Sequence, residues 1–205
     1  MVKTIIRWSG LALVAGALLM GAAIAMVSLR LPGQLPTPLV STILLVASVL
    51  IMLALPAMYA RQSEAAGWLG LVGHVLLEVG IVIVIVYAAA PLFNPEITGL
   101  GESVAAFLLG IAWLLGLVLT AIATLRAEVY PRWSGILLLA AGVGFLFDFF
   151  VAEYLPPIAG QLGNAIFGMV FALAFAWIGV SICMARAKQR RDLLNSAKRR
   201  KEIVG

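Results

Sequence analysis

The chain has 205 residues and a formal net charge of +5, with 63% hydrophobic and 11% charged residues. Soluble domains carry about 25% charged residues, so this composition excludes an ordinary water-soluble fold. With one cysteine and one histidine, the chain alone cannot form a disulfide, a Cys/His metal cluster or a bis-histidine haem. We therefore expect an all-α, polytopic membrane protein that uses no metal or cofactor.

Six apolar runs are long enough to cross the hydrocarbon core of a membrane, which takes about 20 helical residues. In chain order they cover residues 8–29, 39–60, 67–90, 104–125, 133–154 and 162–185. Proline- and glycine-containing segments separate most of them, and residues 61–66 are predicted to form a short polar turn. We predict six transmembrane helices, arranged as three helical hairpins, in a domain of residues 1–185 that precedes a tail of residues 186–205.

The distribution of lysine and arginine predicts the orientation of these helices, because basic residues accumulate on the cytoplasmic side. If the N-terminus is cytoplasmic, every one of the 14 basic residues except Arg30 falls on that side. Eight of them lie between Arg186 and Lys201. We therefore expect both termini in the cytoplasm (N-in/C-in).

A short motif recurs where the odd-numbered runs begin. Residues 7–10 and 132–135 both read Arg-Trp-Ser-Gly, and the third run opens with Trp-Leu-Gly at 68–70. The motif indicates either an internal repeat of three parallel hairpins or only the preference of tryptophan for membrane interfaces. Membership of the first run in this set, and its length, argue against a cleaved signal peptide. The predicted interface anchors are Trp8, Trp68 and Trp133.

Two segments carry a family resemblance. Residues 59–67 read Tyr-Ala-Arg-Gln-Ser-Glu-Ala-Ala-Gly, and residues 130–135 read Tyr-Pro-Arg-Trp-Ser-Gly. They resemble the Y-A-R-Q-like turn after helix 2 and the P-R-W-x-G-like start of helix 5 in an uncharacterised family of small six-helix bacterial integral membrane proteins. The resemblance covers the layout of the whole chain. It implies this fold and a location in the bacterial cytoplasmic (inner) membrane, and it implies no activity.

Four ionisable residues in the predicted helices are candidates for a ligand or proton site, because such residues are costly inside a membrane. His74 and Glu78 share one helix face, and Asp148 and Glu153 lie at greater depths on the fifth helix. If the third and fifth helices pack side by side, the four residues form a ladder for protons or cations. The alternative is structural: His74 and Glu78 bond to each other, or to a carbonyl or serine of a neighbouring helix.

Small residues at helical spacing predict close packing between helices. Gly168, Ala172 and Ala176 have this spacing in the sixth run, and Gly73 and Gly80 lie seven residues apart in the third. We expect these residues to form seams inside the bundle rather than a dimer interface.

The basic tail is expected to act as a topology anchor or to contact anionic lipid headgroups. Nucleic-acid binding is not expected, because no aromatic residue interleaves with the charges. The residues predicted to meet headgroups are Arg190, Arg191, Lys198, Arg199, Arg200 and Lys201.

Three function classes remain open. The chain contains no Walker A, G-x-G-x-x-G or G-x-S-x-G motif, so no catalytic residue is predicted. Short loops and few polar groups favour a non-catalytic membrane protein, such as an accessory subunit with protein partners in the membrane. The alternatives are a small transporter or proton-coupled permease that uses the intramembrane His, Glu and Asp, and a membrane enzyme built on the His74–Glu78 pair.

Overall fold

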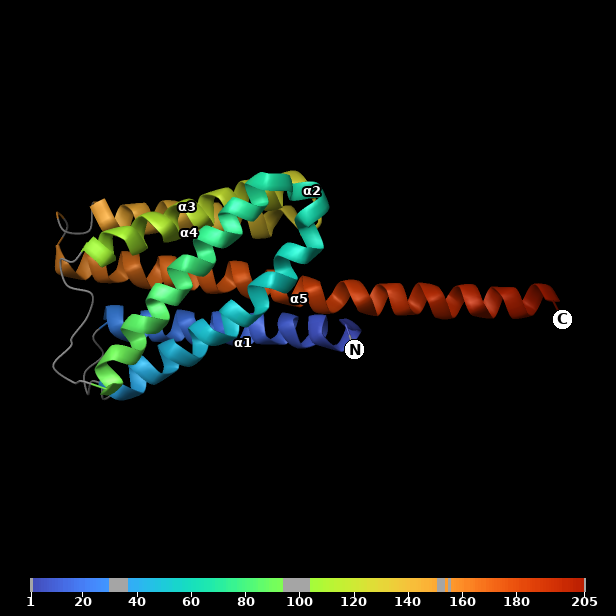
Figure 1. The fold of residues 1–205 in the computed structure, drawn as a ribbon, viewed down its shortest axis with the longest axis horizontal. Coiled ribbons are helices and arrows are strands. Elements are labelled where there is room, and N and C mark those ends of the chain that lie inside the picture. The colour runs from blue at the N-terminus through green and yellow to red at the C-terminus, as the bar shows by residue number, and fades with distance from the viewer. Residues whose placement is uncertain (1, 30–36, 94–103, 151–153, 155, 205) are drawn as a thin grey trace.

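The computed structural model describes residues 2–29, 37–93, 104–150, 154 and 156–204. Nearly all of these residues are helical, and no strand occurs among them, so the all-α prediction is confirmed. The helices, shown in Figure 1, are α1 (Val2–Leu29), α2 (Thr37–Phe93), α3 (Val104–Ala127), α4 (Arg132–Phe150) and α5 (Pro157–Val204).

These helices form a closed bundle. Each helix packs against the next one in the chain, and α1 also packs against α5. Among the described residues, α1, α2, α3 and α5 contain apolar stretches long enough to cross a membrane, and α4 contributes the shorter apolar stretch Arg132–Phe147. This helical bundle is therefore compatible with a membrane protein, as the composition predicts.

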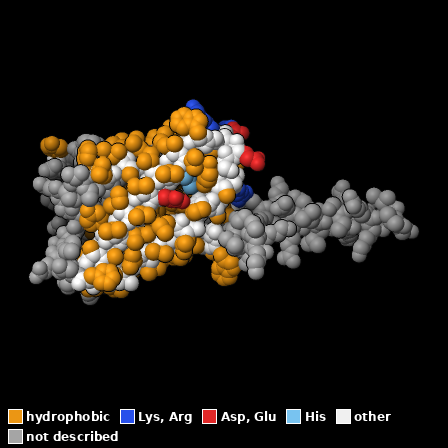
Figure 2. Space-filling view, in the orientation of Figure 1, with side chains coloured by type: hydrophobic (Ala, Val, Ile, Leu, Met, Phe, Trp, Pro, Cys, Tyr) orange, Lys and Arg blue, Asp and Glu red, His pale blue; other side chains and the backbone are white. Residues whose placement is uncertain are grey.

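The outer surface of the bundle is apolar. Leu18, Leu53 and Val86 expose 55%, 62% and 60% of their surface, and they are typical of the large hydrophobic side chains on the outside. Figure 2 shows such side chains covering most of the visible face of the bundle. Large contiguous apolar surfaces are rare on soluble monomers, so this exterior suits a lipid environment.

Helix α2 turns back on itself at Gly67. Its 57 residues would measure about 85 Å in a straight helix. Nevertheless, Nε2 of His74 lies 3.0 Å from the carbonyl oxygen of Leu55, 19 residues earlier, although that many residues of straight helix span about 28 Å. Gly67 has non-helical angles, φ 57° and ψ −152°, and separates a first limb (residues 37–66) from a second limb (residues 68–93). Figure 1 shows both limbs running away from this bend.

The predicted polar turn at residues 61–66 is wrong. These residues are helical, and the reversal takes place at Gly67 alone. The reason is that Gly67 can adopt a backbone conformation with positive φ that a side chain would disfavour, so the polar residues before it remain available for contacts inside the bundle.

Replacing Gly67 by alanine is expected to destabilise the protein by about 1–3 kcal/mol, the usual cost of a strained backbone conformation. Among the described residues, a Cβ at this position meets nothing within 4 Å, so the effect would come from the backbone and not from a clash. The midpoint of thermal unfolding in detergent measures it. Gly163→Ala is the control, because its Cβ would make only an ordinary 3.7 Å contact with Phe147. Equal midpoints for the two variants would contradict the prediction.

The recurring Trp-x-Gly motif has a common geometry. Trp8, Trp68 and Trp133 expose 66%, 76% and 68% of their surface, whereas the glycine two residues later is buried in each case. Two residues turn a helix by about 200°, so the indole points outward while the glycine faces a neighbouring helix. Gly10 approaches α5 and Gly135 approaches α3. This is the arrangement that interface anchors require, and their anchoring role stays a prediction.

Two helix pairs approach closely through small residues. The second limb of α2 and α3 meet at Gly73 with Thr120, Leu77 with Gly116, and Gly80 with Trp113. Helices α1 and α5 meet at Gly10 with Gly179, Gly21 with Ala172, and Ile24 with Gly168. In both pairs the residue numbers rise along one helix and fall along the other, so the helices are antiparallel. The glycines and Ala172 expected in internal seams do lie in them.

Helix α5 does not stop at the end of the bundle. It continues without a break to Val204, and Figure 1 shows this last part projecting beyond the other helices. The basic residues from Arg186 to Lys201 lie on this projecting helix, and their side chains are outside the described residues. The predicted tail is thus a continuation of the last helix.

A buried polar junction as the candidate functional site

The packing order of the helices bears on the predicted proton ladder. Helix α2 packs against α1 and α3, while α4 packs against α3 and α5, so α3 lies between the two helices of the ladder. The side chain of Asp148 and the whole of Glu153 lie outside the described residues. The described packing therefore does not bring the four ladder residues together, and the ladder stays a prediction.

His74 is buried, with 3% of its surface exposed. Its Nε2 lies 3.0 Å from the carbonyl oxygen of Leu55. A carbonyl only accepts hydrogen bonds, so Nε2 carries the hydrogen, and Nδ1 of the neutral ring is an acceptor. Nδ1 is buried and has no hydrogen-bond partner among the described residues. The ring packs beside Tyr59, at 5.2 Å between centroids.

Glu78 lies one turn beyond His74 and is half-buried. Figure 2 shows acidic and histidine side chains close together on the otherwise apolar face. His74 nevertheless bonds to the Leu55 carbonyl and not to Glu78. A bond from His74 to a carbonyl of a packed helical segment is the structural alternative that the sequence left open.

Three helical segments meet around His74. The first limb contacts the second through the bond between Leu55 and His74. The second limb approaches α3 at Gly73, where an added Cβ would lie 2.9 Å from Oγ1 of Thr120. Helix α3 in turn reaches the first limb, because Oγ1 of Thr124 donates to Oε1 of Gln62 at 3.2 Å. We call this meeting point the polar junction, and its residues are Gln62, His74, Thr120 and Thr124.

The polar junction contains three buried atoms without a hydrogen-bond partner among the described residues: Nε2 of Gln62, Nδ1 of His74 and Oγ1 of Thr120. An unpaired buried polar group costs about 1–3 kcal/mol, and such groups normally find a partner. The amide nitrogen donates, the imidazole nitrogen accepts, and the hydroxyl does both. Each of these groups can therefore form a hydrogen bond with a neutral ligand.

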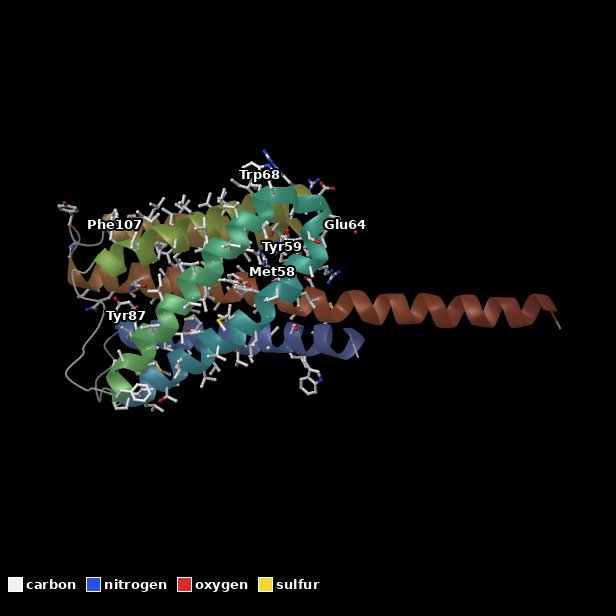
Figure 3. All side chains as sticks on the ribbon, in the orientation of Figure 1. Met58, Tyr59, Glu64, Trp68, Tyr87 and Phe107 are labelled. Carbon is white, nitrogen blue, oxygen red and sulfur yellow. The ribbon has the colours of Figure 1, made fainter. Side chains whose placement is uncertain are left out.

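Tyr130 and Arg61 hold the adjoining end of the bundle together. The hydroxyl of Tyr130 donates to the Met58 carbonyl at 3.1 Å, and Arg61 donates to the Ser181 carbonyl on α5 at 3.0 Å. The guanidinium carbon of Arg61 also lies 5.3 Å from the centre of the Tyr130 ring. Figure 3 shows Met58 inside the bend of α2. These contacts fix the first limb to α5 and to the α3–α4 turn, directly beside Gln62.

Tyr130 is expected to make stability fall above about pH 10. Burial raises the pKa of its phenol above the ordinary 10.0, and the charge of Arg61 opposes part of this shift. Above pH 10 the unfolded chain releases this proton while the folded chain keeps it, so stability decreases by up to about 1.4 kcal/mol per pH unit. Chemical unfolding of Tyr130→Phe at several alkaline pH values should lack this decrease. Tyr154→Phe, at a position 84% exposed, should retain it, and equal slopes for both variants would contradict the prediction.

Sequence reasoning found His74 but missed the residues around it. Two signals were present: Thr120 and Thr124 are four residues apart in an apolar helix, a pattern that forms hydrogen bonds between helices in membranes. Gln62 and Tyr130 belong to the two segments that carry the family resemblance. Within the described part of the chain, no group of three or more His, Cys, Asp or Glu residues could hold a metal ion.

Comparisons with family models, with curated proteins and with solved structures found no match for this chain. Its function is therefore inferred from its own geometry.

Proposed function

We propose that the chain is a non-catalytic subunit of a larger complex in the bacterial cytoplasmic membrane, and that its helical tail binds a partner in the cytoplasm. One observation carries the proposal: α5 extends past the bundle to Val204 as an uninterrupted helix. This segment holds most of the basic residues of the chain, so it presents a strongly positive helix to its surroundings.

Six spans with both termini in the cytoplasm fit the bundle. The bend at Gly67 makes two crossings of α2, and the 19 residues of α4 measure about 28 Å, close to the hydrocarbon thickness of about 30 Å. Figure 1 places the start of α1, the bend of α2 and the tail at one end of the bundle. Arg61 and Arg132 belong to this same end. The positive-inside rule favours the cytoplasm for it, and the family resemblance favours a bacterial inner membrane.

The direction of the tail favours a protein partner over the membrane surface. The tail runs on along α5, so its last residues lie about 28 Å beyond residue 185. We propose that Arg190 and Arg191, which lie within about 9 Å of that point along the helix, meet anionic headgroups. Residues 198–201 lie about 20 Å or more away. We propose that these four cations bind an acidic surface on the partner, because at this distance they lie beyond the headgroup region.

Native mass spectrometry after mild solubilisation tests this proposal. The full chain is compared with a variant in which Lys198, Arg199, Arg200 and Lys201 are all glutamine. We expect the full chain to retain an acidic partner that the variant loses, and we expect added salt to weaken the complex. Asp192→Asn with Glu202→Gln is the matched control, since it raises the positive charge and should keep the partner. A partner that is retained equally by all three proteins would refute the role of the tail.

A proton-coupled permease is the second candidate, and the unpartnered Nδ1 of His74 favours it. Purified protein in vesicles that contain a trapped pH dye should then speed up the response to an external acid pulse. Glu78→Gln should slow it, because Glu78 lies one turn from His74. A proton flux in Glu78→Gln equal to that of the wild type would show that Glu78 takes no part in proton transfer.

A further inference from the structure

We propose that the polar junction holds bound water and that this water exchanges a proton with Nδ1 of His74 from the end of the bundle at which α2 bends. The proposal concerns only this site. It does not depend on the tail or on net transport, because a hydrated histidine can exchange protons without passing them across the membrane.

The unpartnered atoms select water as the ligand. A water molecule can accept a hydrogen bond from Nε2 of Gln62, donate one to Nδ1 of His74, and donate or accept one at Oγ1 of Thr120. Buried waters typically make about three hydrogen bonds to otherwise unsatisfied groups. Gln62 and Thr120 are fully buried and His74 is 3% exposed. The three segments that carry these atoms contact one another in pairs, at Leu55 with His74, at Gly73 with Thr120 and at Gln62 with Thr124.

Polar side chains also mark an approach from the bend of α2 to His74. Thr124 lies one turn closer to the end of α3 than Thr120, and it is bonded to Gln62. Gln62 lies five residues before Gly67, and Arg61 directly precedes it in the first limb. The hydrogen-bonding groups therefore extend from the bend inward to the imidazole. On the other side of the junction, α2 and α3 approach each other closely at Leu77 and Gly116.

The proton balance at His74 is simple. A hydrated proton at the junction transfers to Nδ1, the lone pair of the ring forms the new N–H bond, and a neutral water remains. The resulting imidazolium keeps its Nε2–H bond to Leu55 and donates from Nδ1 to the water. Release reverses these steps. The positive charge moves from the water to the ring, so the total charge is unchanged.

Two charged side chains lie near this site in the sequence. Glu78 is one turn from His74 on the second limb, and Arg61 directly precedes Gln62 on the first limb. Arg61 is directed towards Ser181 and Tyr130. Residues 8–28 of α1 contain no titratable group. The titratable groups on the other segments around the junction are Tyr59, Arg61, Glu64, Glu78 and Tyr87 on α2, Arg126 on α3, Glu128 and Tyr130 in the turn after α3, and Cys183 on α5.

The single histidine of the chain allows a direct test. The full chain, labelled with ¹⁵N-histidine and carrying a histidine-free affinity tag, gives one imidazole spectrum in lipid nanodiscs. We expect a protonated Nε2, an unprotonated Nδ1 at neutral pH, and magnetisation transfer between water protons and the ring. Thr120→Val and Gln62→Leu should each slow this exchange with water about tenfold or more, as expected for the loss of one hydrogen bond to the water that carries the proton.

Two further variants make the test decisive. Thr120→Ser keeps the hydroxyl and should exchange like the wild type. Thr42→Val removes a hydroxyl on α2 that donates to the Pro38 carbonyl and should also change nothing. Wild-type protein without water exchange at the ring would overturn the proposal. Equal exchange rates in Thr120→Val and Thr120→Ser would also overturn the proposal. This holds whether or not the Nε2 signal shows that Thr120→Val has kept the bond of His74 to the Leu55 carbonyl.

Discussion

Gly179→Ala is expected to open the contact between α1 and α5 that closes the bundle. A Cβ on Gly179 would lie 2.7 Å from the carbonyl oxygen of Gly10 and 2.7 Å from Cγ2 of Val14. The carbonyl oxygen belongs to the backbone and cannot rotate away, so the helices must separate. Overpacking of this kind costs about 1–3 kcal/mol. Thermal unfolding in detergent should show a clearly lower midpoint than for the wild type or for Gly163→Ala.

Gly10→Ala tests the same contact between α1 and α5 from the other helix. A Cβ on Gly10 would lie 3.0 Å from the carbonyl oxygen of Gly179 and 2.8 Å from Sγ of Cys183. Once Gly179→Ala has separated the helices, adding Gly10→Ala should cost less than it does alone, because residues in direct contact are not additive. Fully additive losses of stability in the double variant would mean that α1 and α5 do not meet at these two glycines.

Much of this fold can be read from local features of the sequence. The apolar runs predict the helices, because the length of a run and the turn residues after it are local properties. The bend of α2 could be placed only approximately. Residues 61–66 resemble a turn because they are polar, yet Gln62 is fully buried and Arg61 reaches α5. Their polarity serves contacts between helices, and only Gly67 supplies the backbone freedom for a reversal.

The lateral order of the helices could not be predicted, because a hairpin pattern does not specify which hairpins become neighbours. The ladder hypothesis assumed that the second limb of α2 lies beside α4, whereas α3 lies between them. The partners of His74 were missed for the same reason. Thr124 and Gln62 are 62 residues apart, and their pairing depends on the register between α3 and the first limb. A single sequence marks a costly residue such as His74 but not the surface that it faces.

Arg61→Ala is expected to release the first limb of α2 from the part of α5 that precedes the tail. The variant loses a hydrogen bond of 3.0 Å to the Ser181 carbonyl and the stacking of a cation on Tyr130 at 5.3 Å. Hydrogen bonds to charged groups contribute about 1.5–3 kcal/mol and cation–π contacts about 0.5–1 kcal/mol. Because Arg61 is only half-buried, solvent screening brings the expected loss to about 1–2 kcal/mol. Denaturant unfolding in detergent measures it.

Arg132→Ala is the matched control at the same end of the bundle. Arg132 pairs with Glu128 at 2.9 Å, but the two side chains are 77% and 64% exposed, so this pair should contribute little. Equal stability losses for the two arginine variants would show that Arg61 does not tie α2 to α5.

Ser181 lies a few residues before the tail, and Arg61 adjoins Gln62 in the polar junction. If Arg61→Ala weakens both the binding of a tail partner and the exchange of water with His74, the junction and the tail are coupled through this one side chain. If only the binding of the partner weakens, they act independently.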